Sequence, residues 1–200
     1  MDGGCGPGST RAVGGALRDR LRPLAPGDRD VLMRAAAVGR EFDVDLVSQI
    51  ALGGEERIRE VFRRACRLQL VEPVEGCDDR FRFRHALTRD AVYGALVCEQ
   101  LRPLHRDIGV ALERLGRRRA TAVEELAYHW WAAGDARRGV RYNEDAGDRA
   151  SAVHAVAEAL IHYGRALDLA SRRSTARRRI RTKIARLAAA TAAFEPDALR

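Results

Sequence analysis

The stretch LVEPVEGCDDRFRFR, residues 70–84, decides how this chain is expected to fold. Its first six residues form an extended, β-prone run, and residues 76–79 have the composition of a turn. Over residues 80–84, charged and apolar side chains alternate with the period of two that is typical of a strand. The stretch therefore predicts a β-hairpin with Phe81 and Phe83 pointing inward and three arginines pointing outward.

Three short helices are predicted before this hairpin. Pro26 opens the first helix, which is expected to end at Gly39. Asp43 is a suitable N-cap for the second, at about residues 44–51. The third follows a Gly-Gly turn and has one face rich in Arg and Glu. Its apolar face consists of Ile58, Val61, Phe62, Ala65 and Leu68. Three short helices followed by a hairpin is the arrangement of a winged-helix domain.

Alanine-rich helices are predicted from residue 122 onward. Ala155, Ala159, Tyr163 and Ala166 follow the small–small–aromatic–small spacing of the second helix of a tetratricopeptide unit. Small residues at these positions let paired helices approach closely, and the aromatic ring fills the gap between pairs. A poorer copy of the pattern is formed by Gly139, Asn143 and Ala146.

Together these patterns predict a mainly α fold. We expect a disordered N-terminus at residues 1–20 and a winged-helix module with its following helices at residues 21–120. Residues 121–200 are expected to form incomplete α-α repeats of the tetratricopeptide type.

The net charge of +8 is unevenly distributed along the 200 residues. From Ser171 onward, nine basic residues face two acidic ones, whereas the other 170 residues contain 27 arginines and 26 acids. The basic character is therefore a local C-terminal feature rather than a field over the whole protein.

Several runs resemble one family. LAPGDRDVL at residues 24–32, AAVGREF at 36–42 and FRFRHALTRDAVY at 81–93 resemble the winged-helix region of bacterial STAND-type predicted ATPases. This family includes large LuxR-type transcriptional regulators and the ATPase parts attached to some nucleotide cyclases. Shorter matches lie at residues 104–108, 125–130 and 146–150, so the resemblance covers about residues 21–170.

The resemblance implies an ATPase domain before the winged helix, yet the chain has no G-x-x-x-x-G-K-[ST] motif. We therefore expect a non-enzymatic middle piece of a truncated, split or degenerate product, with no cofactor of its own. ADP or ATP would bind only if the chain is paired with an ATPase domain. The expected partners are a P-loop ATPase domain or neighbouring repeats, and an effector protein or small-molecule inducer.

The same resemblance singles out His85 as a nucleotide sensor. In STAND proteins, a histidine at the corresponding place can contact the β-phosphate of ADP on the neighbouring ATPase domain, which would hold a closed form. Arg84 and Arg89 could assist with the phosphate. The alternative is a strand-end histidine bonded to a nearby carbonyl, with both arginines serving as surface charge.

DNA binding is the second possibility. The third helix is rich in arginine, but Glu55, Glu56 and Glu60 occupy its first turns, where contacts to DNA normally concentrate. The phosphate backbone would repel carboxylates there, although the hairpin arginines keep the option open. A stand-alone winged-helix DNA-binding regulator with a helical-repeat effector domain is therefore the alternative function.

The C-terminal basic stretch could contact nucleic acid or an acidic partner. Its candidate residues are Arg177, Arg178, Arg179, Arg181 and Lys183. The alternative is a solvated helix surface next to a missing repeat.

The sequence favours neither a metal site nor a membrane span. No C-x-x-C pair is present, and His154 and His162 lack companions at ligand spacing. No run approaches the ~20 apolar residues of a membrane span, and the N-terminus does not read as a secretory signal. A cytoplasmic protein is expected.

Overall fold

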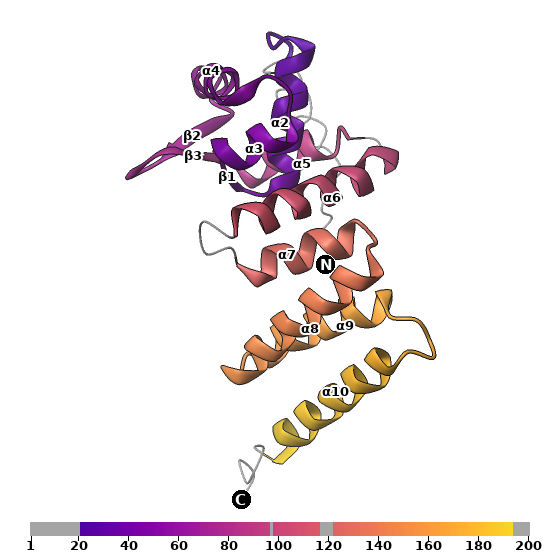
Figure 1. The fold of residues 1–200 in the computed structure, drawn as a ribbon. Helices are drawn as coiled ribbons and strands as arrows, with labels where there is room; N and C mark the ends of the chain where they lie inside the picture. Colours follow the sequence, from indigo (N-terminus) through magenta and orange to yellow (C-terminus); the bar gives the residue numbers. More distant parts are fainter. Residues whose placement is uncertain (1–20, 97, 117–121, 194–200) are drawn as a thin grey trace, which may run out of the picture. The chain divides into compact units, whose positions relative to one another are not determined.

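A computed structural model describes residues 21–96, 98–116 and 122–193 (Figure 1). These residues form a mainly helical fold of nine helices with a small three-stranded antiparallel sheet. The chain divides into two compact units, one up to Leu104 and one from His105. The predicted N-terminal segment 1–20 and the predicted boundary between residues 120 and 121 lie outside the described residues.

The first unit begins with three helices that a short strand interrupts. Its elements are α2 (Pro26–Val38), β1 (Glu41–Asp43), α3 (Val44–Ile50), α4 (Gly54–Arg67), β2 (Val71–Val74), β3 (Cys77–Phe83) and α5 (Ala86–Tyr93). The three predicted helices and the hairpin are present, and Gly39 and Asp43 occupy the predicted cap positions. The second strand of the hairpin begins earlier than expected, at Cys77.

The sheet has the strand order β1-β3-β2, so the hairpin gains a third strand that the sequence analysis did not predict. In β1, Phe42 pairs with Phe81 of β3. The predicted inward orientation of Phe81 and Phe83 is confirmed, since both are buried. The centre of the Phe42 ring lies 4.9 Å from the centre of the Phe62 ring and 5.3 Å from that of the Phe83 ring. These aromatic contacts join the sheet to α4.

Four of the five residues predicted for the apolar face of α4 lie in the core of the first unit, whereas Leu68 is the half-buried C-cap residue. Ile58, Val61, Phe62 and Ala65 are at most 2% exposed. Gly53, with φ of 116°, turns the chain into this helix. Because this φ lies in the left-handed region, a larger residue would be strained there.

The second unit is a succession of helices. Helix α6 (Cys98–Leu115) leads into it, followed by α7 (Val123–Ala132), α8 (Ala136–Ala152), α9 (Val156–Leu169) and α10 (Thr175–Ala193). Helices α7, α8 and α9 pack side by side in chain order (Figure 1). Gly134, with φ of 71°, makes the turn before α8, whose N-cap Asp135 accepts a hydrogen bond from the Arg138 amide.

Helices α8 and α9 approach each other closely because small residues line their contact. Ala159, Tyr163 and Ala166 of α9 are buried. A Cβ added at Gly147 of α8 would lie 2.5 Å from the Tyr163 ring. Ile180 of α10 completes this cluster. The sequence spacing therefore identified three side chains that share one contact, whereas the fourth predicted residue, Ala155, is the half-buried N-cap residue of α9.

Candidate functional site

The three residues proposed to sense a nucleotide lie where strand β3 gives way to α5. His85 is the exposed N-cap residue of α5, and its carbonyl accepts hydrogen bonds from the amides of Thr88 and Arg89. The exposed Arg84 lies 3.7 Å from a carboxylate oxygen of Glu72. A bond from Arg82, helped by the charges of Arg84 and His85, lowers the pKa of Glu72. Arg84 and His85 thus form a solvent-facing corner beside the Glu72 carboxylate.

Arg89 has contacts of its own within the first unit. Its Nε donates to the carbonyl of Ala36 at 2.9 Å, and its guanidinium lies 5.1 Å from the centre of the Tyr93 ring. An ion pair with Asp90 at 3.1 Å takes up another nitrogen. Arg89 therefore fastens α5 to α2, and His85 is left with Arg84 as its cationic neighbour among the three residues.

All five arginines of α4 are paired with carboxylates. Arg59 binds Asp79 at 2.8 Å and Glu55 at 3.0 Å. The remaining pairs are Arg63 with Glu56 and Glu60, Arg67 with Glu60, and Arg57 and Arg64 with the buried Asp28. Hydrogen bonds from these arginines lower the pKa values of Glu60 and Asp79. The charge of this helix is consequently balanced within the unit.

The outward arginines of the hairpin are paired as well. Arg80 lies 3.0 Å from Glu41, and Arg82 lies 2.7 Å from Glu72. The predicted outward direction is confirmed, because Arg80, Arg82 and Arg84 are exposed. Each of them nevertheless has an acidic neighbour, which reduces the positive field that a DNA backbone would meet.

Three of the five candidate residues in the C-terminal basic stretch have partners inside the second unit. Arg177 donates to the carbonyls of Leu167 and Ala170, at 2.8 and 3.0 Å. Nε and Nη2 of Arg179 each donate a hydrogen bond of 2.6 Å to a different carboxylate oxygen of Glu144. These contacts attach α10 to the end of α9 and to α8.

Lys183 completes this network. Its Nζ lies 2.7 Å from Glu144 and 2.6 Å from Asp148. The bond from Arg179, supported by Lys183, lowers the pKa of Glu144. Arg178 and Arg181 are exposed, and neither forms an ion pair with any residue that the structure describes. Among the five candidates, these two are the ones left to meet a partner.

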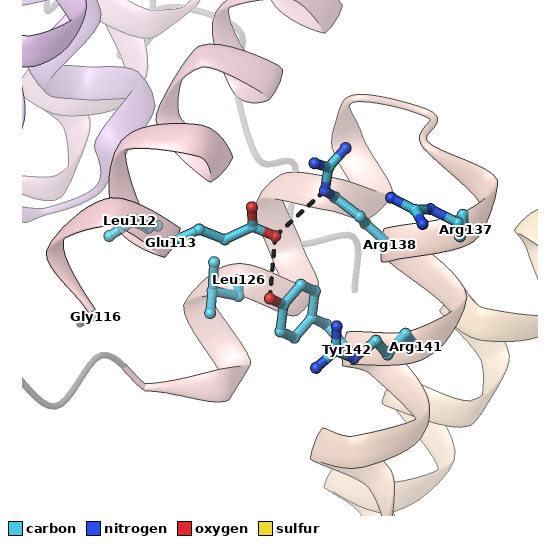
Figure 2. A pocket seen from close by; sticks show the side chains of 8 residues that line it. All are labelled: Leu112, Glu113, Gly116, Leu126, Arg137, Arg138, Arg141 and Tyr142. Carbon is cyan, nitrogen blue, oxygen red and sulfur yellow. Dashed lines mark hydrogen bonds and ion pairs between the residues drawn. The ribbon is translucent and has the colours of Figure 1, made fainter.

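A hollow in the second unit gathers three arginines that the sequence analysis did not single out (Figure 2). We call it the arginine pocket. It has a volume of about 520 Å³ and is lined by Leu112, Glu113, Gly116, Leu126, Arg137, Arg138, Arg141 and Tyr142. The end of α6, the start of α7 and the first turns of α8 therefore supply its walls.

Glu113 organises one side of this pocket. It accepts a hydrogen bond from the Tyr142 hydroxyl at 3.0 Å and pairs with Arg138 at 3.3 Å (Figure 2). Burial, together with the bond to Glu113, raises the pKa of Tyr142. Arg138 also stacks over the Trp130 ring, 4.5 Å from its centre. Arg138 is consequently held in place, whereas Arg137 and Arg141 are exposed.

The sequence did contain a signal for this pocket. Arg141 follows Arg137 by four positions and Arg138 by three, which are the spacings at which side chains on one helix are neighbours. The walls from α6 and α7 come from elsewhere in the chain, so helical spacing alone could not reveal a hollow.

Comparisons with protein-family models, with curated proteins and with solved structures give no match for this chain. Within the part of the chain that the structure describes, no three His, Cys, Asp or Glu side chains gather as a metal ion would require. No helix among these residues is long and apolar enough to cross a membrane.

Proposed function

We propose that this chain is a non-enzymatic regulatory and protein-interaction module of a STAND-type signal-transduction or transcriptional regulator. The first unit would be a winged helix that docks on a P-loop ATPase domain. The second would be a set of tetratricopeptide-like repeats that receives an effector. The observation that carries the proposal is the internal charge balance of α4, the helix that a DNA-binding winged helix would insert into the major groove.

The order of elements supports the winged-helix assignment. Helix α2, strand β1, helices α3 and α4, and the hairpin of β2 and β3 follow one another in the first unit. The strand that closes the hairpin lies in the middle of the sheet, between β1 and β2. In this arrangement the hairpin lies beside α4, which contacts β2, as a wing would.

The ion pairs favour a protein partner over DNA. A groove-binding helix uses unpaired Arg and Lys to neutralise phosphates and to contact base edges. In α4, the arginines most open to solvent, Arg63 and Arg67, both contact Glu60. Moving this face onto DNA would bring Glu55 and Glu56 against phosphates and would break these pairs.

The packing of α8 on α9 supports the repeat assignment. A glycine of the first helix lies against an aromatic ring of the second, flanked by buried alanines. Helix α10 then adds its apolar side to the same cluster through Ile180. Stacked helical pairs of this kind present extended surfaces for partners.

Docking can be tested with a STAND-type P-loop ATPase domain loaded with ADP or with ATP. The full chain should bind the ADP form more tightly in a biolayer interferometry assay, since His85 would contact the β-phosphate, which is the terminal group in ADP but is followed by the γ-phosphate in ATP. His85→Ala should weaken binding to the ADP form about tenfold, the scale of one lost hydrogen bond to a charged group.

The exposed His154 of the second unit provides the control, because His154→Asn changes a histidine far along the chain from the proposed contact. Equal affinity for the ADP and ATP forms would contradict nucleotide-dependent docking, as would an unchanged affinity of the His85 variant. ATP hydrolysis by the purified chain above buffer background would contradict the non-enzymatic assignment.

The second candidate is a stand-alone DNA-binding regulator with a helical-repeat effector domain. Its support is the solvent-facing row of Arg80, Arg82 and Arg84 on the hairpin. A specific complex with duplex DNA whose affinity falls steeply with salt would favour this candidate over the first.

A further inference from the structure

We propose that the arginine pocket binds a small organic molecule that carries a phosphate monoester. This inference gives the helical unit a class of effector and rests on the proposed function for its regulatory meaning. The binding itself is a property of the second unit, because every residue that lines the pocket lies after His105.

The lining of the pocket has an excess of positive charge. Three arginines face one acid, Glu113, and that acid is already bonded to Arg138 and to the Tyr142 hydroxyl. Arg137 and Arg141 are exposed, and neither forms an ion pair with a residue in the described part of the chain. Two cationic groups are therefore available at the pocket for an anion from outside.

The spacing of these two arginines favours a phosphate over a carboxylate. Arg137 and Arg141 are one helical turn apart on α8, which places their side chains on the same strip of the helix. A guanidinium binds two oxygens of one anion in a fork-like geometry. A phosphate monoester has three terminal oxygens and nearly two negative charges at neutral pH, so it can engage both arginines. A monocarboxylate is already satisfied by one.

The other walls favour an organic group attached to the phosphate. Leu112 and Leu126 are buried residues whose side chains reach the lining (Figure 2). Tyr142 adds an aromatic ring, and the guanidinium of Arg141 lies 5.2 Å from the centre of that ring. The volume of about 520 Å³ is far larger than an inorganic phosphate needs. It falls in the range of about 300–1,000 Å³ typical of small-molecule sites.

Acids on the neighbouring strip of α8 do not cancel this charge. Arg137 and Arg141 also border a second hollow with Glu144, Asp145 and Asp148. Glu144 and Asp148 are held by Lys183, at 2.7 and 2.6 Å. Asp145 is the acid that remains to compete with a ligand for Arg141.

The test is a titration of the full 200-residue chain with phenyl phosphate and with glucose 6-phosphate. Binding is followed by line broadening of the ³¹P resonance and by calorimetry at constant ionic strength. Both esters should bind, whereas phenol and glucose should not. Inorganic phosphate should bind at least about tenfold more weakly, because it lacks the apolar contact worth roughly 25 cal/mol per Å².

Two variants with the same loss of charge locate the site. Arg137→Gln with Arg141→Gln should lower the affinity by tenfold or more, at about tenfold per charge-assisted contact. Arg178→Gln with Arg181→Gln removes two exposed arginines from α10 and should change it less than about twofold, the scale of screened surface charge. Asp145→Asn should leave the affinity equal or raise it.

Three results would overturn the proposal. Equal losses in the two double variants would mean non-specific attraction to basic residues. Equal affinity for inorganic phosphate and the esters would exclude a contribution of the organic group to binding. Tighter binding of a phosphoserine peptide than of either small ester would assign the pocket to a protein partner. Since the readout is ligand binding by the chain alone, failure here leaves the ADP-dependent docking measurement unaffected.

Discussion

The contact of Arg179 with Glu144 decides whether the C-terminal basic stretch is a binding surface or part of the fold. Glu144→Gln keeps the shape of the side chain and removes its charge. Glu144 is 8% exposed and receives two bonds of 2.6 Å from Arg179 and one of 2.7 Å from Lys183. The substitution therefore weakens three charge-assisted contacts together.

The expected cost lies between two limits. Exposed ion pairs contribute about 0–1 kcal/mol, whereas breaking a buried pair costs about 3–5 kcal/mol. Because the Arg179 side chain is 56% exposed, water screens its side of the pair. We expect Glu144→Gln to destabilise the second unit by about 2 kcal/mol, and a double-mutant cycle with Arg179→Gln to give a coupling energy of about 1 kcal/mol.

Chemical denaturation and hydrogen exchange of the α10 amides measure these quantities. Arg178→Gln serves as the control, since Arg178 is exposed on the same helix. The low pKa of Glu144 adds a pH signature: the stabilisation is present above the ordinary value of 4.5 and is lost as the pH falls below it. A coupling energy within about 0.3 kcal/mol of zero would refute the structural role of Arg179. Arg179 would then again be a candidate for contact with nucleic acid or an acidic partner.

Two further predictions concern the packing of the second unit. Gly147→Ala should destabilise the unit by about 1–3 kcal/mol in thermal or urea unfolding, because the new methyl group would lie 2.5 Å from the Tyr163 ring, which its hydroxyl bond to Asp148 holds in place. Gly164→Ala is the control, since a Cβ at Gly164 meets nothing within 4 Å. Equal effects of the two substitutions would contradict the close approach of α8 and α9. Burial, aided by Arg165, lowers the pKa of His162, so its contribution to stability should be complete above the ordinary value of 6.5 and decline as the pH falls below it. His162→Gln should reduce this decline, measured as the difference between the unfolding free energies from urea titrations at pH 7.5 and 5.5. An unchanged difference would contradict the role of His162 in this pH dependence.

The sequence predicted best those elements whose pattern is local. The alternation around Phe81 and Phe83 predicted strand β3, and the apolar period from Ile58 to Ala65 predicted the buried face of α4. In α9, the spacing of Ala159, Tyr163 and Ala166 picked out residues that are buried together. Each pattern repeats within one element, so the side chains that share a face can be identified before the fold is known.

Contacts between distant segments could not be predicted in this way. Strand β1 is three residues long and has too few residues for a period, and it forms because Phe42 pairs with Phe81. Glu144 and Arg179 are 35 positions apart, so the sequence showed a basic stretch without showing its acids. The arginine pocket was missed for the same reason, since Leu112, Leu126 and Arg141 belong to three helices.

The charge of α4 is balanced within the protein, and we propose that this balance suits its face to a protein partner instead of DNA. Fluorescence anisotropy with duplex DNA at several salt concentrations tests it, using the wild type and the triple variant Glu55→Gln, Glu56→Gln, Glu60→Gln. A second triple variant, Glu124→Gln, Glu158→Gln, Asp168→Asn, adds the same charge at exposed acids of the second unit.

We expect weak, sequence-independent binding by the wild type. Freeing Arg63 and Arg67 from their glutamates should tighten binding at low salt about tenfold more than the control variant does. The slope of log affinity against log salt should steepen by about 0.9 for each phosphate that a freed arginine contacts. A wild-type chain that already forms a specific, steeply salt-dependent complex with DNA, or an α4 variant that binds no better than the control, would contradict the account.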